Sequence, residues 1–239
     1  DRGHVNGWAL FDKIYCISVR ERRDRRSSAR REFQRAGLGE RVEFHLVERH
    51  PEDTEQGIYE SHLACLRAGL AAGAETILIF EDDVLLNPMD APLGIKLTGA
   101  LAMEGWEMLC LGALVDGSSA GDTPGVRQIR YRALTHAYAV TAATARRLVE
   151  IPWQGVPYDG MLRTEIQHAY ALYPSTAFQS NSPSDNAKHP RLERFRLWCG
   201  GLRRIQRVNE VYHRHRRLLV VIHTASLLAV IGVAWWWLT

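Results

Sequence analysis

Cysteine is scarce in this chain of 239 residues, and its four copies never form a CxxC pair. Cys16, Cys65, Cys110 and Cys199 lie far apart, which argues against a zinc site and a disulfide scaffold and fits a reducing compartment. Internal repeats and low-complexity segments are absent as well. A hydrophobic content of 46% and a charged content of 24% are ordinary for a globular protein. The length suits one α/β domain with an appendage.

Lysine is almost absent, so arginine carries nearly all of the positive charge. The net charge is only +3, but it is spread unevenly. Arginines gather between Arg20 and Arg35 and again between Arg191 and Arg217. The first cluster is expected to be mostly a solvated helix face or a contact for lipid phosphate.

The acidic triplet Glu81-Asp82-Asp83 directly follows the apolar run Thr76 to Phe80. The run predicts a buried parallel strand, and ligands of open α/β sheets bind just past the carboxyl ends of such strands. Buried carboxylates must be paired or metal-bound, because burying them alone is very costly. A hard divalent cation takes oxygen ligands and can also hold a diphosphate. The triplet therefore predicts a metal site for a nucleotide-activated substrate; a solvated acidic turn is the alternative.

Strand and helix patterns alternate along the chain and predict an α/β sandwich with catalytic loops at the strand ends. Gly37 is expected to close a helix, and Ser61 and Thr141 are expected to cap helices. The segment 112–125, rich in Gly, Ser, Asp and Pro, is expected to be a loop over the site. Strands are expected at 14–19, 42–47, 76–80, 108–111, 126–132, 135–140 and 169–173, and helices at 24–36, 61–72, 142–150 and from 158.

The segment Leu218 to Leu238 contains 21 residues without a charge. At about 1.5 Å per residue this length crosses a hydrocarbon core of about 30 Å. It ends in three tryptophans, which prefer the membrane interface, and arginines precede it, which favours a cytoplasmic flank. The sequence thus predicts a transmembrane helix over 218–238 in the inner (cytoplasmic) membrane, with the folded domain facing the cytoplasm. A C-terminal helix that is buried or lies on the surface is the alternative.

Residues 191–217 hold nine arginines against two glutamates, with apolar residues interleaved at partly helical spacing. This pattern predicts a basic amphipathic segment lying on anionic lipid. A nucleic-acid patch is the rival, and it is disfavoured because a hydrophobic anchor follows directly. The predicted organisation is therefore a catalytic domain at 1–190, a juxtamembrane segment at 191–217 and the transmembrane helix at 218–238.

A series of short motifs carries a resemblance to a known family. They are Ile17-Ser18-Val19, Asp24-Arg25-Arg26, Ser61-His62-Leu63, Ile79-Phe80-Glu81-Asp82-Asp83-Val84, His136-Ala137-Tyr138, Tyr158-Asp159 and Tyr173-Pro174. In this order they resemble glycosyltransferase family 25, which includes lipopolysaccharide-biosynthesis galactosyltransferases and collagen galactosyltransferase domains. Each motif alone is weak, whereas the ordered set, with the acidic triplet after an apolar strand, is fairly specific.

The resemblance implies a GT-A-like, Rossmann-type sandwich and an inverting, metal-dependent glycosyltransferase. It would move a hexose, with galactose favoured, from a UDP-sugar to an envelope glycan such as the lipopolysaccharide core. Glu81 and Asp83 match the outer positions of the DxD-type pattern and would hold Mn²⁺ or Mg²⁺, while Asp82 would reach the ribose or the sugar. The cation would stabilise the charge of the leaving UDP. The acceptor would be lipid-linked, and a membrane anchor would raise the effective concentration of the enzyme near it.

Asp159 is the predicted catalytic base, because inversion requires a base that removes the acceptor proton on the face opposite the leaving group. Capping of the following helix is the alternative role for Asp159, and Glu165 is a weaker substitute as the base. Ser18, Arg25 and Arg26 are predicted near the uridine and phosphates, since arginine suits phosphate through paired donors.

Ser61 and His62 are predicted near the nucleotide, and His136 on the acceptor or sugar side. A structural core histidine is the alternative for His62. His189 loosely matches a late metal-binding histidine, with a surface histidine as the alternative. Two other classes of protein stay open: another metal-dependent enzyme acting on nucleotides or phosphate esters, and a non-catalytic membrane-anchored assembly subunit of a glycan pathway.

Overall fold

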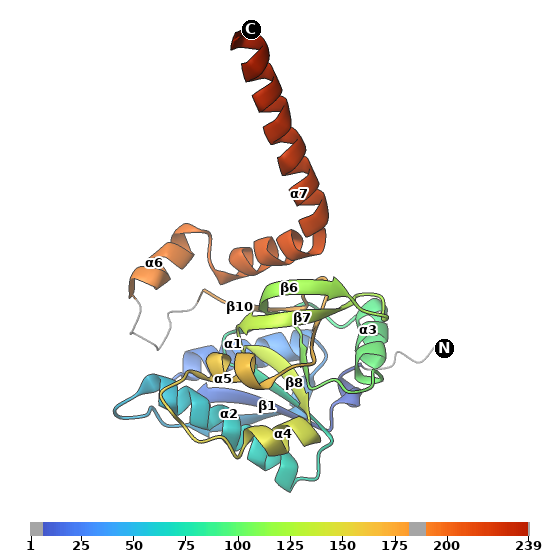
Figure 1. Cartoon of the computed structure of the whole chain (residues 1–239). Coiled ribbons are helices and arrows are strands. Elements are labelled where there is room, and N and C mark those ends of the chain that lie inside the picture. The colour runs from blue at the N-terminus through green and yellow to red at the C-terminus, as the bar shows by residue number, and fades with distance from the viewer. Residues whose placement is uncertain (1–6, 182–189, 239) are drawn as a thin grey trace.

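A mixed eight-stranded sheet forms the centre of the domain in the computed structural model, which describes residues 7–181 and 190–238 (Figure 1). Its strand order is β2-β1-β3-β8-β5-β9-β7-β6. The strands are β1 (Lys13–Val19), β2 (Val42–Val47), β3 (Thr76–Glu81), β5 (Met108–Cys110), β6 (Leu114–Ala120), β7 (Val126–Ala133), β8 (Ala137–Thr141) and β9 (Ala169–Leu172). A separate antiparallel pair joins β4 (Val84–Leu86) to β10 (Ala177–Gln179).

Helices cover both faces of the sheet. The helices of the described residues are η1 (Gly7–Leu10), α1 (Arg23–Arg35), η2 (Gly39–Arg41), α2 (Thr54–Ala71), α3 (Ala91–Leu101), α4 (Ala142–Leu148), α5 (Tyr158–Glu165), α6 (Pro190–Trp198) and α7 (Leu202–Leu238). Side chains of α2, α4 and α5 share one core cluster, and side chains of η1, α1 and α3 share the other. The predicted α/β sandwich is confirmed.

Strand β3 shows how the sequence builds this sandwich. Ile77 and Ile79 belong to one core, whereas Leu78 and Phe80 belong to the other, because successive strand residues point to opposite faces. All four side chains are completely buried, as expected for a strand covered on both faces. β3 runs parallel to β1, and β1 runs parallel to β2, so their carboxyl ends meet at one edge of the sheet. The predicted parallel strand is confirmed.

Helix ends confirm two predictions and correct a third. Gly37 follows α1 with φ of 74°, and the Thr141 hydroxyl accepts a hydrogen bond from the Thr144 amide at 3.2 Å. The expected start of α2 at Ser61 is wrong, because α2 begins at Thr54 and its cap is Asp53. Ser61 lies inside the helix, where its hydroxyl donates to the Gly57 carbonyl at 2.6 Å.

The expected loop over 112–125 is also wrong. This segment contains β6, which pairs antiparallel with β7 and has register shifts between Leu114 and Gly117. β6 is an edge strand of the sheet, and many of its residues are small or polar. Because loops have a similar composition, the sequence suggested a loop here. β6 packs against α7, and the residues of 112–125 do not line the cleft described below.

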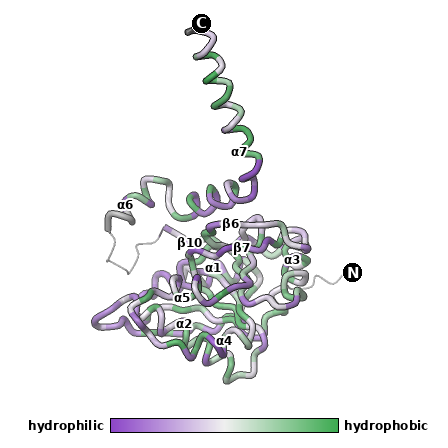
Figure 2. Tube along the Cα trace, in the orientation of Figure 1, coloured by the Kyte–Doolittle hydropathy of each residue, from purple (hydrophilic) through white to green (hydrophobic). Residues whose placement is uncertain are grey.

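Helix α7 consists of two parts that meet at His215, whose φ of −111° and ψ of 16° interrupt the helix. We call residues 202–214 the docked half, because this part packs against β6 and β10. Residues 216–238, the apolar half, project away from the domain and are predominantly hydrophobic (Figures 1 and 2). The helix from Leu202 to Trp237 is long and apolar enough to cross a membrane, and its most apolar stretch is not buried in the protein.

Candidate functional site

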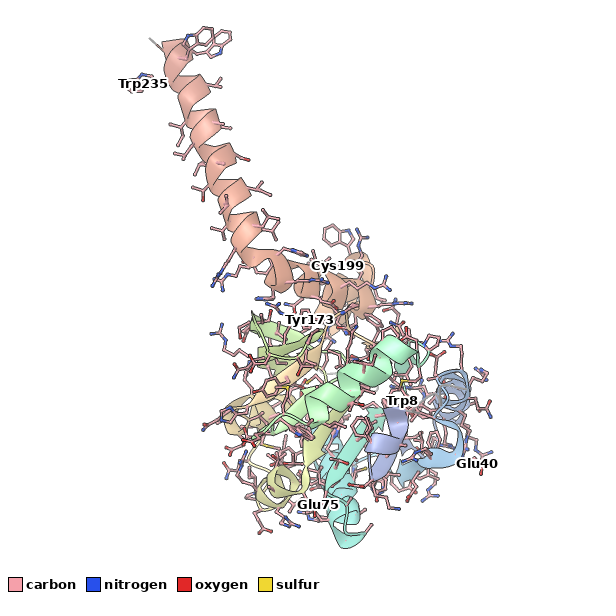
Figure 3. The ribbon with its side chains drawn as sticks, turned by 90° about the vertical axis from the view of Figure 1, so that its right-hand side faces the viewer. Trp8, Glu40, Glu75, Tyr173, Cys199 and Trp235 are labelled. Atoms are coloured by element: carbon pink, nitrogen blue, oxygen red, sulfur yellow. The ribbon has the colours of Figure 1, made fainter. Side chains whose placement is uncertain are left out.

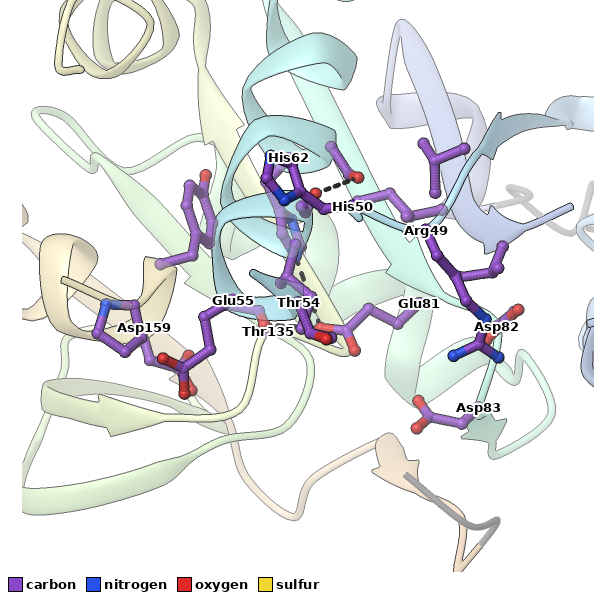
Figure 4. A pocket seen from close by; sticks show the side chains of 18 of the residues that line it. Arg49, His50, Thr54, Glu55, His62, Glu81, Asp82, Asp83, Thr135 and Asp159 are labelled. Carbon is purple, nitrogen blue, oxygen red and sulfur yellow. Dashed lines mark hydrogen bonds and ion pairs between the residues drawn. The ribbon is translucent and has the colours of Figure 1, made fainter. Parts of the chain in front are cut away.

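A cleft of about 360 Å³ opens where the carboxyl ends of β1, β2 and β3 meet (Figure 4). The starts of α2 and α5, Arg25 from α1 and Arg196 from α6 complete its wall. Seven of the predicted site residues line this cleft, namely Arg25, Ser61, His62, Glu81, Asp82, Asp83 and Asp159. Ser18, Arg26 and His136 are not among the residues that line it. The prediction of a site at the strand ends therefore coincides with a cleft.

The acidic triplet is divided between two environments. β3 ends at Glu81, and Asp82-Asp83 form a turn before β4, so the strand alternation stops there. Arg25 Nε lies 2.8 Å from Asp82 Oδ1, and Arg25 Nη2 lies 2.6 Å from Asp83 Oδ2. Glu81 instead accepts a hydrogen bond from the Thr135 hydroxyl at 2.6 Å and faces His62. Asp82 and Asp83 thus share Arg25 as their partner. The prediction from the sequence was instead that Glu81 and Asp83 act together, as ligands of a metal ion.

Arg26 and Ser18 support this arrangement from behind. The Arg26 guanidinium donates to the Ser18 hydroxyl at 3.3 Å, to the Val19 carbonyl at 3.2 Å and to the Arg20 carbonyl at 3.3 Å. It thereby fixes the turn between β1 and α1, from which Arg25 reaches the carboxylates. Of the two arginines predicted near the phosphates, Arg25 lines the cleft and Arg26 does not.

Burial controls the protonation of the carboxylates. Burial and the neighbouring charge of Glu81 raise the pKa of Asp83 to about 7. Burial also raises the pKa of Asp82, although Arg25 and the Ser18 hydroxyl oppose the rise. Burial acts against ionisation of Glu81 too, but His62 and the Thr135 hydroxyl outweigh it and lower the pKa of Glu81 to about 2. Burial therefore opposes the ionisation of Asp82 and Asp83, and the Arg25 cation pairs with both of them.

The donor set fits a hard cation at Asp82 and Asp83. Asp82 Oδ2 and Asp83 Oδ1 are buried and lack a hydrogen-bond partner in the part of the chain that the structure describes. A proton or a cation would satisfy such oxygens. The described residues include no group of three or more His, Cys, Asp or Glu side chains arranged to hold a metal. An ion at these two carboxylates would have to take its remaining ligands from substrate phosphates and water, as Mg²⁺ does in many proteins.

His62 belongs to a buried chain of polar groups. Its Nδ1 lies 3.0 Å from the Tyr138 hydroxyl, which lies 2.9 Å from the Tyr158 hydroxyl. Its Nε2 faces Glu81 Oε1 at 3.6 Å. The histidine thus lines the cleft and is also held by the core, and its predicted place near the nucleotide stays a prediction. The sequence motifs contained Tyr138 and Tyr158, but gave no sign that their hydroxyls orient the histidine.

His136 has a structural position. Its side chain is 1% exposed, and burial lowers its pKa, so the ring is neutral near pH 7. Its backbone carbonyl accepts a hydrogen bond from the Glu81 amide at 3.1 Å. His136 is not among the residues that line the cleft, and its backbone carbonyl helps to hold the end of β3. The predicted contact of His136 with sugar or acceptor stays a prediction. His189 lies outside the described residues.

Asp159 lies in the first turn of α5 and lines the cleft. Its Oδ1 accepts a hydrogen bond from the Tyr131 hydroxyl, and the Leu134 backbone amide also contacts the carboxylate. Burial raises the pKa of Asp159, whereas the Tyr131 hydrogen bond opposes the rise. Pro157 stands at the cap position of α5 without a side-chain hydrogen bond, so Asp159 is not the residue at that cap. Glu165, at the end of α5, is not among the lining residues.

Leu134 has a φ of 82°, which is uncommon for a residue other than glycine. This conformation turns the chain between β7 and β8, so that the Leu134 amide meets Asp159 while Thr135 meets Glu81. Backbone strain of this kind often persists where the surrounding structure fixes a functional geometry. The sequence offered no signal for Leu134, Thr135 or Tyr131.

No protein-family model and no curated protein matches this sequence. Among solved structures, the chain is similar to a glycosyltransferase involved in the glycosylation of the major capsid of PBCV-1, with 16% identity, 64% of this chain and 75% of that chain covered and a TM-score of 0.40. It is also similar to the galactosyltransferase LgtC in complex with donor and acceptor sugar analogs, with 12% identity, 80% of this chain and 96% of that chain covered and a TM-score of 0.40. A third similar structure is A197 from STIV, with 14% identity, 70% of this chain and 84% of that chain covered and a TM-score of 0.40. Likeness at this level assigns neither a family nor an activity, and the resemblance to family 25 stays a prediction.

Proposed function

We propose that this protein is a membrane-attached glycosyltransferase of the GT-A kind that uses a nucleotide sugar. The observation that carries the proposal is the cleft in which two environments face each other. Asp82 and Asp83 with Arg25 lie at one side, and Asp159 lies at the other (Figure 4). Group transfer from a charged leaving group to a hydroxyl requires such a pair: charge stabilisation at one end and a base at the other.

On the donor side, Asp82 and Asp83 would hold Mn²⁺ or Mg²⁺ together with the diphosphate of a UDP-sugar. The cation supplies Lewis-acid stabilisation of the leaving UDP when it is bound. Arg25 keeps the two carboxylates ordered and adds a positive charge beside them. Glu81, which the sequence placed at the metal, contributes charge from the His62 side of the cleft. Ser61 and His62, which line the cleft, would lie near the nucleotide.

On the acceptor side, Asp159 is the proposed base of an inverting reaction. The Tyr131 hydroxyl and the Leu134 amide orient the carboxylate, which would accept the proton of an acceptor hydroxyl. As the acceptor oxygen bonds to the anomeric carbon, the bond from that carbon to the diphosphate oxygen breaks, and the acceptor proton passes to Asp159. The electron pair of the broken bond leaves with UDP. Burial raises the pKa of Asp159 and thereby strengthens it as a base.

The acceptor side of the proposal includes the membrane. The apolar half of α7 would span the inner membrane, and the arginines at its base would keep the domain in the cytoplasm. A lipid-linked glycan of the cell envelope, such as the lipopolysaccharide core, would then be within reach of a tethered enzyme. Galactose is the proposed hexose, from the resemblance to family 25.

The test is UDP release by the full chain in detergent across a panel of UDP-sugars, with Mn²⁺ or with EDTA. We expect metal-dependent turnover of one UDP-sugar, lost in Asp83→Asn and reduced by about 10²–10⁴-fold in Asp159→Asn. Asp122→Asn, a change at an exposed aspartate, is the matched control. Failure to bind any UDP-sugar would reject the proposal in favour of the assembly subunit, and turnover only of free nucleotides or phosphate esters would favour the other metal-dependent class.

A further inference from the structure

The docked half of α7 has an inverted distribution of polarity. The side chains that it turns toward the domain are polar: Gln206 is 0% exposed and Glu210 is 8% exposed. The side chains that it turns outward include apolar ones among the arginines: Val208 is 62% exposed and Val211 is 56% exposed. A helix on the surface of a soluble domain normally shows the opposite arrangement, with its apolar stripe toward the core. The outward valines are therefore available for contact with a partner less polar than water.

Specific hydrogen bonds hold this orientation. Asn209 pairs with both backbone groups of Val115: its Oδ1 accepts from the amide at 2.9 Å, and its Nδ2 donates to the carbonyl at 3.0 Å. Gln206 Nε2 donates to the Ala177 carbonyl at 2.8 Å, and Glu210 Oε2 accepts from the Ser175 amide at 3.0 Å. Rotation of the helix to bury Val208 and Val211 would break these bonds. The outward apolar side is thus a fixed property of the fold.

Helix α6 adds a second apolar surface. Phe195, Leu197 and Trp198 are 56%, 52% and 83% exposed, and the rings of Phe195 and Trp198 lie 6.0 Å apart. Exposed clusters of large apolar side chains mark contact surfaces in soluble proteins, and tryptophan prefers the boundary between an apolar phase and water. Two adjacent helices with outward apolar side chains indicate one shared contact surface.

The charge of this surface selects its partner. Exposed arginines alternate with the apolar side chains, and Glu210, the one acidic residue in the sequence from 194 to 217, is buried against the domain. A basic helix surface with tryptophan, phenylalanine and leucine is the pattern of helices that lie in the headgroup layer of anionic bilayers. The exposed arginines are Arg194, Arg203, Arg204, Arg207, Arg214, Arg216 and Arg217.

The kink at His215 gives this surface the right orientation. The docked half runs across the domain, and the apolar half leaves from its end (Figure 1). α6 lies on the same side of the domain, and Trp235 marks the far end of the apolar half (Figure 3). A bilayer that contained the apolar half would therefore meet α6 and the docked half at its surface.

We infer that α6 and the docked half of α7 form an interfacial surface that lies on an anionic bilayer and holds the cleft at the headgroup layer. Arg196 makes the connection, since it stands between Phe195 and Leu197 in α6 and lines the cleft. The acceptor class that fits this geometry is a membrane lipid that carries its accepting hydroxyl close to the headgroup. The inference rests on the membrane attachment proposed above, and it is independent of the donor and of the reaction.

The test uses the full chain in nanodiscs of phosphatidylcholine and phosphatidylglycerol. A nitroxide is placed at Trp198→Cys or Val208→Cys in a Cys199→Ser background, because the other cysteines are buried. Glu75→Cys, an exposed position in the domain remote from α6 and α7, is the control (Figure 3). We expect relaxation by lipid-soluble oxygen to exceed relaxation by a water-soluble nickel chelate several-fold at 198 and 208, and the reverse at 75.

Two outcomes would overturn the inference. Labels at 198 and 208 that respond to nickel as position 75 does would place the surface in water, and labels shielded from both reagents would show a protein partner or a second copy there. The charge contribution is tested with Arg194→Glu plus Arg204→Glu, which should reduce the oxygen response at 198, against Arg31→Glu on α1 as a control. None of these readouts requires a donor sugar, so failure of the proposed transferase activity would leave them interpretable.

Discussion

The imidazole of His62 lies parallel to the ring of Tyr158, with ring centroids 4.3 Å apart and an interplanar angle of 6°. Tyr138 joins both groups through its hydroxyl, at 3.0 Å from His62 Nδ1 and 2.9 Å from the Tyr158 hydroxyl. This contact fixes the plane of the imidazole and directs Nε2 toward Glu81. The contacts of the protein itself therefore set the orientation of this imidazole in the cleft.

Tyr138→Phe should destabilise the protein by about 1–3 kcal/mol, because it leaves buried polar groups of His62 and Tyr158 without a partner. Urea unfolding of the full chain in detergent measures this change. Tyr212→Phe is the matched control, since Tyr212 is 45% exposed on α7. Equal midpoints for the two variants would contradict the role of the hydroxyl chain in stability.

Arg25→Ala should cost about 3–5 kcal/mol of folding free energy, because it leaves two buried carboxylates without their shared partner. The comparison is with Arg23→Ala, a change at an exposed arginine of the same helix. Adding Asp83→Asn to Arg25→Ala should restore part of the loss, since it removes one of the uncompensated charges. A double variant that is less stable than Arg25→Ala would argue against charge burial as the cause.

Tyr131→Phe should move the acid limb of the rate profile to higher pH. The Tyr131 hydroxyl lowers the pKa of Asp159 by bonding its ionised form, so its loss leaves the effect of burial unopposed and the pKa rises further. The proposed base acts only when it is ionised. Because the pKa of Asp159 is higher in the variant, a higher pH is needed to reach the same ionised fraction and the same rate. Turnover measured from acid to neutral pH checks the direction, with Tyr170→Phe as control. An unshifted profile would separate Asp159 from the rate-controlling ionisation.

The strand–helix framework was predictable because burial on both faces produces continuous apolar runs such as Thr76 to Phe80. The start of α2 was not predicted correctly. Asp53 caps this helix through its side chain, but it follows a segment with ordinary loop composition. The acidic triplet was found from its position after a strand. The separation of Glu81 from Asp82 and Asp83 could not be predicted in this way. It depends on contacts of the two aspartates with Arg25 and Gln179, which are distant in sequence. Tertiary hydrogen bonds such as that of Tyr131 leave no local pattern.

Gly112→Ala should destabilise the domain by about 1–3 kcal/mol through overpacking. A Cβ at this position would lie 2.0 Å from the Ala177 carbonyl oxygen and 2.4 Å from Gln206 Nε2, so backbone would have to move. Gly117→Ala is the control, because nothing lies within 4 Å of a Cβ there. The measurement is thermal unfolding of both variants, and we expect the unfolding temperature to fall for Gly112→Ala and to change little for Gly117→Ala. A loss for Gly117→Ala as large as that for Gly112→Ala would point to a general effect of the substitution.

Asn209→Ala should loosen the docked half of α7 from β6. Both Val115 backbone groups would lose their partner, and unpaired groups of this kind cost about 1–3 kcal/mol each if they stay buried. Hydrogen exchange at the Val115 amide should accelerate, while exchange in the central strand β3 stays slow. Val208→Ala, an outward change on the same helix, should leave the Val115 amide protected.

The pairing of Asn209 with Val115 has a practical consequence for shortened forms of the protein. β6 is the last strand of the sheet, and an uncovered terminal strand is a template for strand addition by another molecule. A chain cut before Leu202 would expose that template and should self-associate. A cut just after the bend at His215 would remove the hydrophobic tail yet keep the cover, which makes it the better boundary for a soluble, crystallisable fragment.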